Sequence, residues 1–236
     1  MATIASRLHQ VRARIERACV AAGRPVQSVT LLAVGKTHPP ALLREAYDAG
    51  QRAFGENYVQ EAQAKIDALS DLRATIEWHL IGPLQSNKTR AVAEQFDWVH
   101  SVDRVKLAER LAAQRPAQLA PLQVCLQVNI SGEASKSGAA PDDVAALARA
   151  VASLPGLRLR GLMAIPEPAP DFDAQRRAHR ALHELLAALR RDPQLGAAPL
   201  DTLSMGMSDD LEAAIAEGAT LVRVGSAIFG ARAAAA

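Results

Sequence analysis

The chain alternates regularly between two kinds of segment, and this alternation restricts its possible folds more than any other feature does. Short apolar runs with β-strand character are followed by longer segments in which apolar residues recur at helical spacing. The expected strands cover residues 30–36, 52–54, 75–81, 97–102, 123–129, 157–164, 201–205 and 221–224. Such alternation is typical of a parallel sheet, because two parallel strands need a crossover connection between them.

Eight strand–helix units fit into the 236 residues, and an amphipathic segment over residues 5–22 precedes them. This count predicts an α/β fold, a single (β/α)8 TIM barrel with an additional N-terminal helix. A doubly wound open sheet is the alternative if one of the strand assignments is wrong. No linker or change of composition divides the chain, so we expect residues 1–236 to form one domain.

Composition excludes several classes of partner. Aromatic residues make up only 3% of the chain and the net charge is +2, which argues against nucleic-acid binding. No apolar run approaches membrane-spanning length, so we expect no membrane partner. Cys19 and Cys125 lie in apolar surroundings without metal-ligand spacing, which is typical of buried thiols in a reducing compartment. We therefore expect a cytoplasmic protein, and an aliphatic barrel without an evident exposed apolar stripe favours a monomer.

The first expected strand ends in a lysine, Lys36. Alternate residues of a strand share a face, so Lys36 points the same way as Leu32 and Val34. If that face is the barrel interior, the amine stands at the C-terminal end of a buried strand, where active groups gather in this fold. Loss of hydration favours the neutral amine, which can form a Schiff base with an aldehyde. The alternative is a solvated lysine that merely ends a strand.

The loops after the last two strands indicate an anion site. Residues 204–208 contain two serines, and Gly225 and Ser226 follow the last strand. Loops at these places form the recurrent phosphate site of the barrel fold, although a Gly-Ser pair is also a common helix cap, and we interpret Ser208 as a cap. A ligand that carries both an aldehyde and a phosphate fits Lys36 and these loops together. Pyridoxal 5′-phosphate is such a ligand.

Arg223 shares a strand face with Leu221 and Gly225, so it can point to the barrel mouth beside Lys36. The pyridine nitrogen of the cofactor would accept a hydrogen bond from it. Arginine keeps its proton, so the ring nitrogen would stay unprotonated and the ring would be a weak electron sink. The alternative for Arg223 is an ion pair with a carboxylate.

Motifs along nearly the whole chain resemble the YggS/PROSC family of pyridoxal phosphate homeostasis proteins. They are VGKT (34–37), FGENYVQE (54–61), WHLIGPLQSNK (78–88), VNIS (128–131), KSG (136–138), GLM (161–163), LSMGMSDD (203–210) and RVGSAIFG (223–230). The resemblance implies the fold of the alanine racemase N-terminal barrel. It implies a Schiff base on Lys36 and a contact from Arg223 to the pyridine nitrogen. It also implies a phosphate site at Ser204, Gly225 and Ser226, and ring surroundings at Asn57, His79 and Met163. At residue 226 we expect threonine in many relatives, and serine retains the hydroxyl.

Three functions are compatible with such a site. The first is a non-catalytic carrier that binds pyridoxal 5′-phosphate and buffers it or delivers it to apo-enzymes. The second is an amino-acid racemase, which needs a second base, but neither of the two tyrosines, Tyr47 and Tyr58, ends a strand. The third is a Schiff-base aldolase that works without the cofactor. The weak electron sink favours the carrier over the racemase, and the resemblance disfavours the aldolase. We interpret His100 and His179 as ordinary core-edge and surface histidines, and the loop at 131–138, with Lys136, as a lid or a second phosphate contact.

Overall fold

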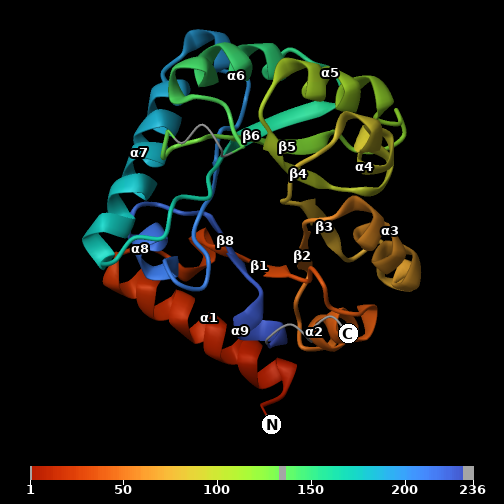
Figure 1. The fold of residues 1–236 in the computed structure, drawn as a ribbon, viewed down its shortest axis with the longest axis vertical. Coiled ribbons are helices and arrows are strands. Elements are labelled where there is room, and N and C mark those ends of the chain that lie inside the picture. Colours follow the sequence, from red (N-terminus) through yellow and green to blue (C-terminus); the bar gives the residue numbers. More distant parts are fainter. Residues whose placement is uncertain (1, 133–136, 231–236) are drawn as a thin grey trace.

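The strands form a closed parallel barrel in the computed structural model, which describes residues 2–132 and 137–230 (Figure 1). They are β1 (Thr30–Val34), β2 (Ala53–Glu56), β3 (Glu77–Leu80), β4 (Trp98–Val102), β5 (Leu122–Gln127), β6 (Leu157–Met163), β7 (Thr202–Ser204) and β8 (Leu221–Val224). Each strand pairs in parallel with the next, and β8 pairs with β1, with Thr30 opposite Leu221. This closure confirms the TIM barrel and rules out the open sheet.

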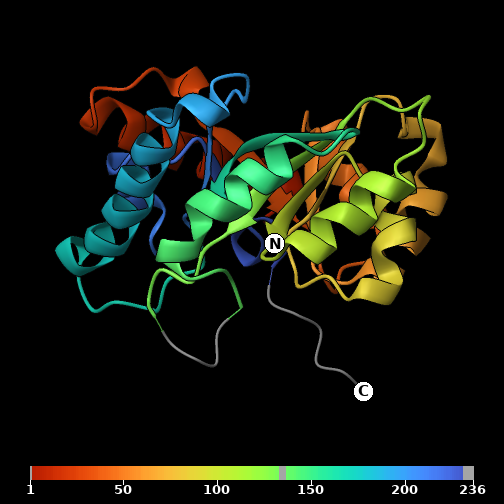
Figure 2. The ribbon, with the colours of Figure 1, turned by 90° about the horizontal axis from the view of Figure 1, so that it is seen from above.

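Helices follow the strands and cover the outside of the barrel (Figure 2). They are α2 (Pro40–Asp48), α3 (Val59–Ala68), α4 (Thr89–Gln95), α5 (Val105–Gln114), α6 (Val144–Ala152), α7 (Phe172–Arg190), α8 (Leu211–Ala216) and α9 (Ser226–Phe229). The additional N-terminal helix is confirmed as α1 (Ile4–Ala21), which lies outside the barrel against α2, α8 and α9 (Figure 1). Thr3 caps α1 by accepting a hydrogen bond from the backbone N–H of Ser6. None of the described helices is long and apolar enough to cross a membrane.

The first strand shows how the alternation of side chains positions the functional groups. Leu31 and Ala33 pack outward into the main core beneath the helices. Leu32 and Val34 face the other way and belong to a small apolar cluster with Ile81. Lys36 follows Val34 by two positions and continues the inward face, as the period of the strand predicts. That the whole chain, residues 1–236, forms one domain stays a prediction.

Candidate functional site

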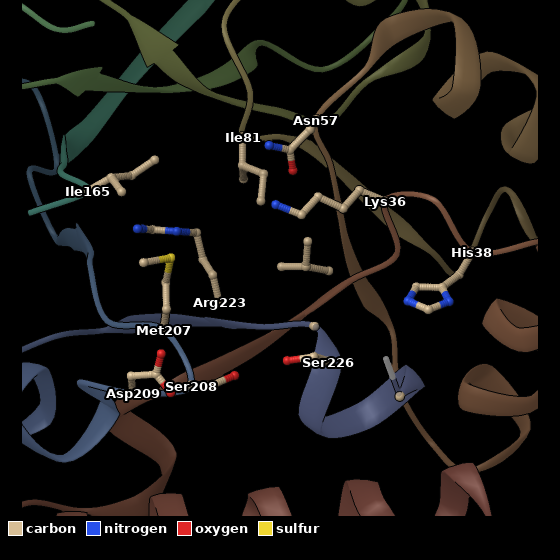
Figure 3. Close-up of a pocket in the computed structure, with 13 residues that line it drawn as sticks. Lys36, His38, Asn57, Ile81, Ile165, Met207, Ser208, Asp209, Arg223 and Ser226 are labelled. Atoms are coloured by element: carbon tan, nitrogen blue, oxygen red, sulfur yellow. The ribbon is translucent and has the colours of Figure 1, made fainter. Parts of the chain in front are cut away.

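A pocket of about 270 Å³ opens at the C-terminal end of the barrel (Figure 3). Its walls come from residues at the ends of β1, β2, β3, β6, β7 and β8 and from the loops that follow them. They are Val34, Lys36, His38, Asn57, Ile81, Ile165, Met207, Ser208, Asp209, Arg223, Gly225, Ser226 and Gly230. Active sites of this fold lie at the same end, because that is where loops from all strands meet.

Lys36 enters the pocket from the end of β1. Its side chain is half-buried and points between Asn57 and Ile81 (Figure 3). The next residue, Thr37, has a φ of 66°, in the left-handed region that a β-branched residue rarely adopts. The backbone therefore turns sharply just after the lysine, and such strain persists only where surrounding contacts hold it.

A buried cluster of charges supplies those contacts. Lys65 Nζ donates to the carbonyl oxygen of Gly35 at 2.7 Å and to both carboxylate oxygens of Glu56 at 2.8 and 2.9 Å. It also contacts Glu61 Oε1 at 2.5 Å, and the same oxygen accepts the Thr37 N–H at 2.6 Å. The cluster thus fixes the backbone on both sides of Lys36. Sequence reasoning missed it, because the four-residue spacing of Glu61 and Lys65 on a helix also fits an ordinary surface pair.

The Glu56 carboxyl group is fully buried at the end of β2. Burial raises the pKa of Glu56 to about 7, and the neighbouring Lys65 ammonium opposes that shift. Gly35 has no side chain for a related reason, since a Cβ atom there would lie 2.6 Å from Glu56 Oε1. Close approach of this carboxylate to β1 therefore requires glycine beside the lysine.

Arg223 lies at the floor of the pocket, with a side chain that is buried in the barrel. Its Nη1 donates to the carbonyl oxygen and the hydroxyl of Ser204 at 2.6 and 2.8 Å, and its Nη2 donates to the Ala164 carbonyl at 2.9 Å. No ion pair among the described residues includes Arg223, so the carboxylate alternative is not met. Burial lowers the pKa of Arg223 to about 10, which leaves the guanidinium charged at neutral pH.

The opposite side of the pocket offers hydroxyl groups. Ser208 and Ser226 come from the loops after β7 and β8, and their hydroxyl groups point toward each other (Figure 3). Ser208 is not the helix cap that we expected, because α8 begins at Leu211 and has Asp210 as its N-cap. Ser208 therefore remains in the pocket wall. A Cβ atom on Gly225 would lie 3.2 Å from the Val34 carbonyl oxygen, so glycine allows β8 to approach the end of β1.

Asn57 also reaches the pocket, as the sequence predicted. Its Oδ1 atom is buried and has no hydrogen-bond partner among the described residues. A buried acceptor of this kind is costly unless a ligand or water satisfies it. Gly82 lies against the backbone of Asn57, since a Cβ atom on Gly82 would lie 2.3 Å from the Asn57 carbonyl oxygen.

Three predicted site residues, His79, Met163 and Ser204, are absent from the pocket walls. The reason is their depth in the barrel. His79 and Met163 precede the lining residues Ile81 and Ile165 by two positions, so they share the inward face but lie one layer lower. Ser204 lies beneath Arg223 and bonds to it. The three side chains therefore do not line the ligand-free pocket, and the predicted roles of Ser204 toward the phosphate and of His79 and Met163 toward the ring stay predictions. Lys136, the other residue considered at this end, lies outside the described residues.

Two histidines are buried more deeply than expected. His100 is fully buried inside the barrel, where its ring nitrogens lie 3.0 Å from His79 Nδ1 and 2.8 Å from Ser204 Oγ. The interpretation of a core-edge residue was wrong, although the alternation within β4 does place His100 on one face with Trp98. His179 is also buried, not at the surface, and its Nε2 lies 3.0 Å from Asp210 Oδ2.

Comparisons with known proteins agree with this geometry. The family model "Alanine racemase, N-terminal domain" matches residues 7–233. The chain is 63% identical to the pyridoxal phosphate homeostasis protein of Pseudomonas aeruginosa, over 98% of this chain and 97% of that protein. It is 55% identical to the protein of the same name from Escherichia coli, over 98% of both.

A solved structure extends the likeness to three dimensions. PipY of Synechococcus elongatus, solved with PLP bound, is 41% identical and superposes with a TM-score of 0.83, covering 97% of this chain and all 100% of that one. The family predicted from the motifs is thereby confirmed. The chain belongs to the alanine racemase N-terminal domain family and, within it, to the YggS/PROSC family of pyridoxal phosphate homeostasis proteins.

Proposed function

We propose that this protein binds pyridoxal 5′-phosphate as a Schiff base on Lys36 and buffers or delivers it in the cytoplasm without turnover. The observation that carries the proposal is the arrangement of complementary groups around one pocket. An amine, Lys36, lies on one wall, and two hydroxyls, those of Ser208 and Ser226, lie on another. The names of the relatives and the PLP-bound structure of PipY support the same ligand.

The residues of the pocket fit this cofactor. When bound, the cofactor would supply an aldehyde that condenses with an amine. Lys36 is the amine within the pocket, and Asn57 beside it presents an acceptor that lacks a partner. For the phosphate we assign Ser208 in place of Ser204, together with Gly225 and Ser226, because the Ser204 hydroxyl is already engaged beneath the floor. Asp209 also lines the pocket and is exposed at its rim.

Arg223 would face the pyridine nitrogen. Its hydrogen bonds to Ser204 and Ala164 engage three of the five N–H donors that a guanidinium carries, which leaves donors for a ligand. A guanidinium does not give up its proton at neutral pH, so the ring nitrogen would accept a hydrogen bond and stay unprotonated. An unprotonated ring withdraws electrons weakly, which suits holding the cofactor better than stabilising a carbanion.

The second candidate, a racemase, needs a base on each face of the substrate carbon. Neither tyrosine of the chain lies in the pocket walls. The Tyr47 hydroxyl bonds to Thr75 Oγ1 at 2.8 Å on the outside of the barrel, and Tyr58 is 59% exposed. We therefore propose a non-catalytic carrier, monomeric in solution, whose recipients are apo-enzymes that depend on the same cofactor.

The test is covalent trapping. Purified protein incubated with pyridoxal 5′-phosphate is reduced with borohydride, digested and examined by mass spectrometry. The adduct is expected on Lys36, and Lys36→Ala should show neither the adduct nor the yellow colour of the loaded protein. Lys88→Ala, a substitution outside the pocket, serves as the matched control. An adduct on another lysine would refute the assignment, and Lys36-dependent racemisation of alanine would refute the carrier.

A further inference from the structure

A continuous line of polar side chains crosses the barrel interior beneath the pocket. Arg223 Nη1 lies 2.8 Å from Ser204 Oγ, which lies 2.8 Å from His100 Nδ1. His100 Nε2 lies 3.0 Å from His79 Nδ1, and His79 Nε2 lies 3.7 Å from Glu77 Oε2. The first four side chains are buried, whereas the Glu77 side chain is 60% exposed. The line therefore joins the pocket floor to the N-terminal end of β3, at the opposite face of the barrel.

The Arg223 guanidinium, at the pocket end of this line, is a buried positive charge that needs compensation. A buried cation is costly unless oxygen acceptors or an anion stabilise it. Arg223 has oxygen acceptors on Ser204 and Ala164, but no carboxylate of the described residues lies within ion-pair distance of it. The negative charge of Asp210 acts on Arg223 from beyond that distance. Glu77 is the carboxylate nearest to the far end of the polar line, 3.7 Å from His79 Nε2.

The direction of each hydrogen bond follows from the chemistry of the donors. Arg223 can only donate, so Ser204 Oγ accepts from it. The buried Ser204 hydroxyl proton then finds an acceptor in His100 Nδ1, which must be unprotonated. His100 consequently carries its proton on Nε2 and donates it to His79 Nδ1. His79 in turn carries a proton on Nε2, which faces the Glu77 carboxylate at 3.7 Å, longer than a hydrogen bond.

The opposite direction is less favourable at both ends. It would leave the Ser204 proton without an acceptor and would turn a lone pair of His79 toward the Glu77 carboxylate. Burial also lowers the pKa of both His79 and His100, in agreement with neutral rings. Trp98 holds the His79 ring in place, since the two rings stack at 5.3 Å with an angle of 9° between their planes. The ring is thus fixed in the orientation that the chain of bonds requires.

We propose that Ser204, His100 and His79 are positioning residues that form a one-way hydrogen-bonded chain from Arg223 to His79, whose Nε2 faces Glu77 at 3.7 Å. The chain fixes the orientation of Arg223 at the pocket floor, and the Glu77 carboxylate orients the His79 ring at the far end. The expected effect of this chain on the affinity for pyridoxal 5′-phosphate rests on the proposed function. The direction of the chain is a property of the ligand-free protein.

The first test uses the ligand-free protein, labelled with ¹⁵N in its histidine side chains. Long-range ¹H–¹⁵N spectra near neutral pH are expected to show His79 and His100 as neutral rings protonated at Nε2. A ring protonated at Nδ1, or at both nitrogens, would overturn the proposal. In Ser204→Ala, the His100 resonances should lose the signature of a hydrogen-bonded Nδ1. Cys125→Ala, a buried substitution near Trp98 in the barrel interior but outside the chain, should leave them unchanged.

The second test measures the affinity for pyridoxal 5′-phosphate by titration. Ser204→Ala should raise the Kd by about tenfold, because a hydrogen bond to a charged group is lost, whereas Cys125→Ala should change it less than about twofold. Glu77→Gln, which alters an exposed side chain and so preserves the fold, should raise the Kd and shift the His79 resonances. Unchanged His79 resonances and Kd in Glu77→Gln would refute the role of Glu77. If the wild-type protein fails to bind the cofactor, the proposed function fails, while the spectra still decide the direction of the chain.

Discussion

Replacing Lys65 by methionine tests the buried charge cluster that holds the backbone around Lys36. Methionine keeps most of the volume of the lysine stem but removes the ammonium group. The Gly35 carbonyl and the carboxylates of Glu56 and Glu61 then lose their shared donor. Breaking a buried ion pair on one side costs about 3–5 kcal/mol when the remaining charge stays buried. Glu56 can lower that cost by taking up a proton, so the loss of stability depends on pH.

The sign follows from the pKa of Glu56. A carboxyl group whose pKa is raised on folding contributes stability at low pH, and this contribution is lost as the pH rises toward the folded-state pKa. In the wild-type protein the loss ends near pH 7, where the pKa of Glu56 lies. In Lys65→Met the pKa of Glu56 lies higher, because the ammonium that lowered it is gone. Above neutrality the variant therefore keeps losing stability, by up to about 1.4 kcal/mol per pH unit relative to the wild type.

The assay is urea unfolding of both proteins, followed by circular dichroism from about pH 6 to about pH 9. We expect a difference in unfolding free energy of about 1–3 kcal/mol at the acidic end, from the lost hydrogen bonds alone. This difference should grow steadily toward the alkaline end. The double variant Lys65→Met/Glu56→Gln is the control. Because glutamine cannot ionise, the difference in unfolding free energy between this variant and the wild type should not grow as the pH rises. A difference that stays constant with pH in the single variant would refute the reasoning.

Two further predictions concern the pocket walls. Ser226→Ala should raise the Kd for pyridoxal 5′-phosphate by about tenfold, because the phosphate loses a hydrogen bond. The unfolding free energy should not change, since Ser226 is exposed in the ligand-free protein. If the variant and the wild type retain the cofactor equally in a filtration assay, the phosphate site lies elsewhere. Gly82→Ala would place a Cβ atom 2.3 Å from the Asn57 carbonyl oxygen, so it should displace Asn57 and weaken cofactor binding. A titration curve identical to that of the wild type would contradict a role for Asn57.

The barrel and the place of Lys36 could be predicted from the sequence because both depend on local patterns. Alternation of strand and helix segments predicted all the strands, and their bounds differ from the expected ones by one or two residues at most ends. By the two-residue period of a strand, Lys36 lies on the same inward face as Leu32 and Val34, and this face leads into the pocket. The motifs then predicted the family, which the comparisons confirm.

Only the tertiary structure decided the depth of each inward side chain and its partners. The two-residue period states which face a residue occupies, but the stagger between strands decides which layer of the barrel it reaches. For this reason Ile81 lines the pocket while His79 lies beneath it. The Ser204 hydroxyl illustrates the same limit, because its neighbours His100 and Arg223 lie 104 and 19 residues away along the chain. Contacts of this kind arise when the barrel closes, and no local pattern of the sequence records them.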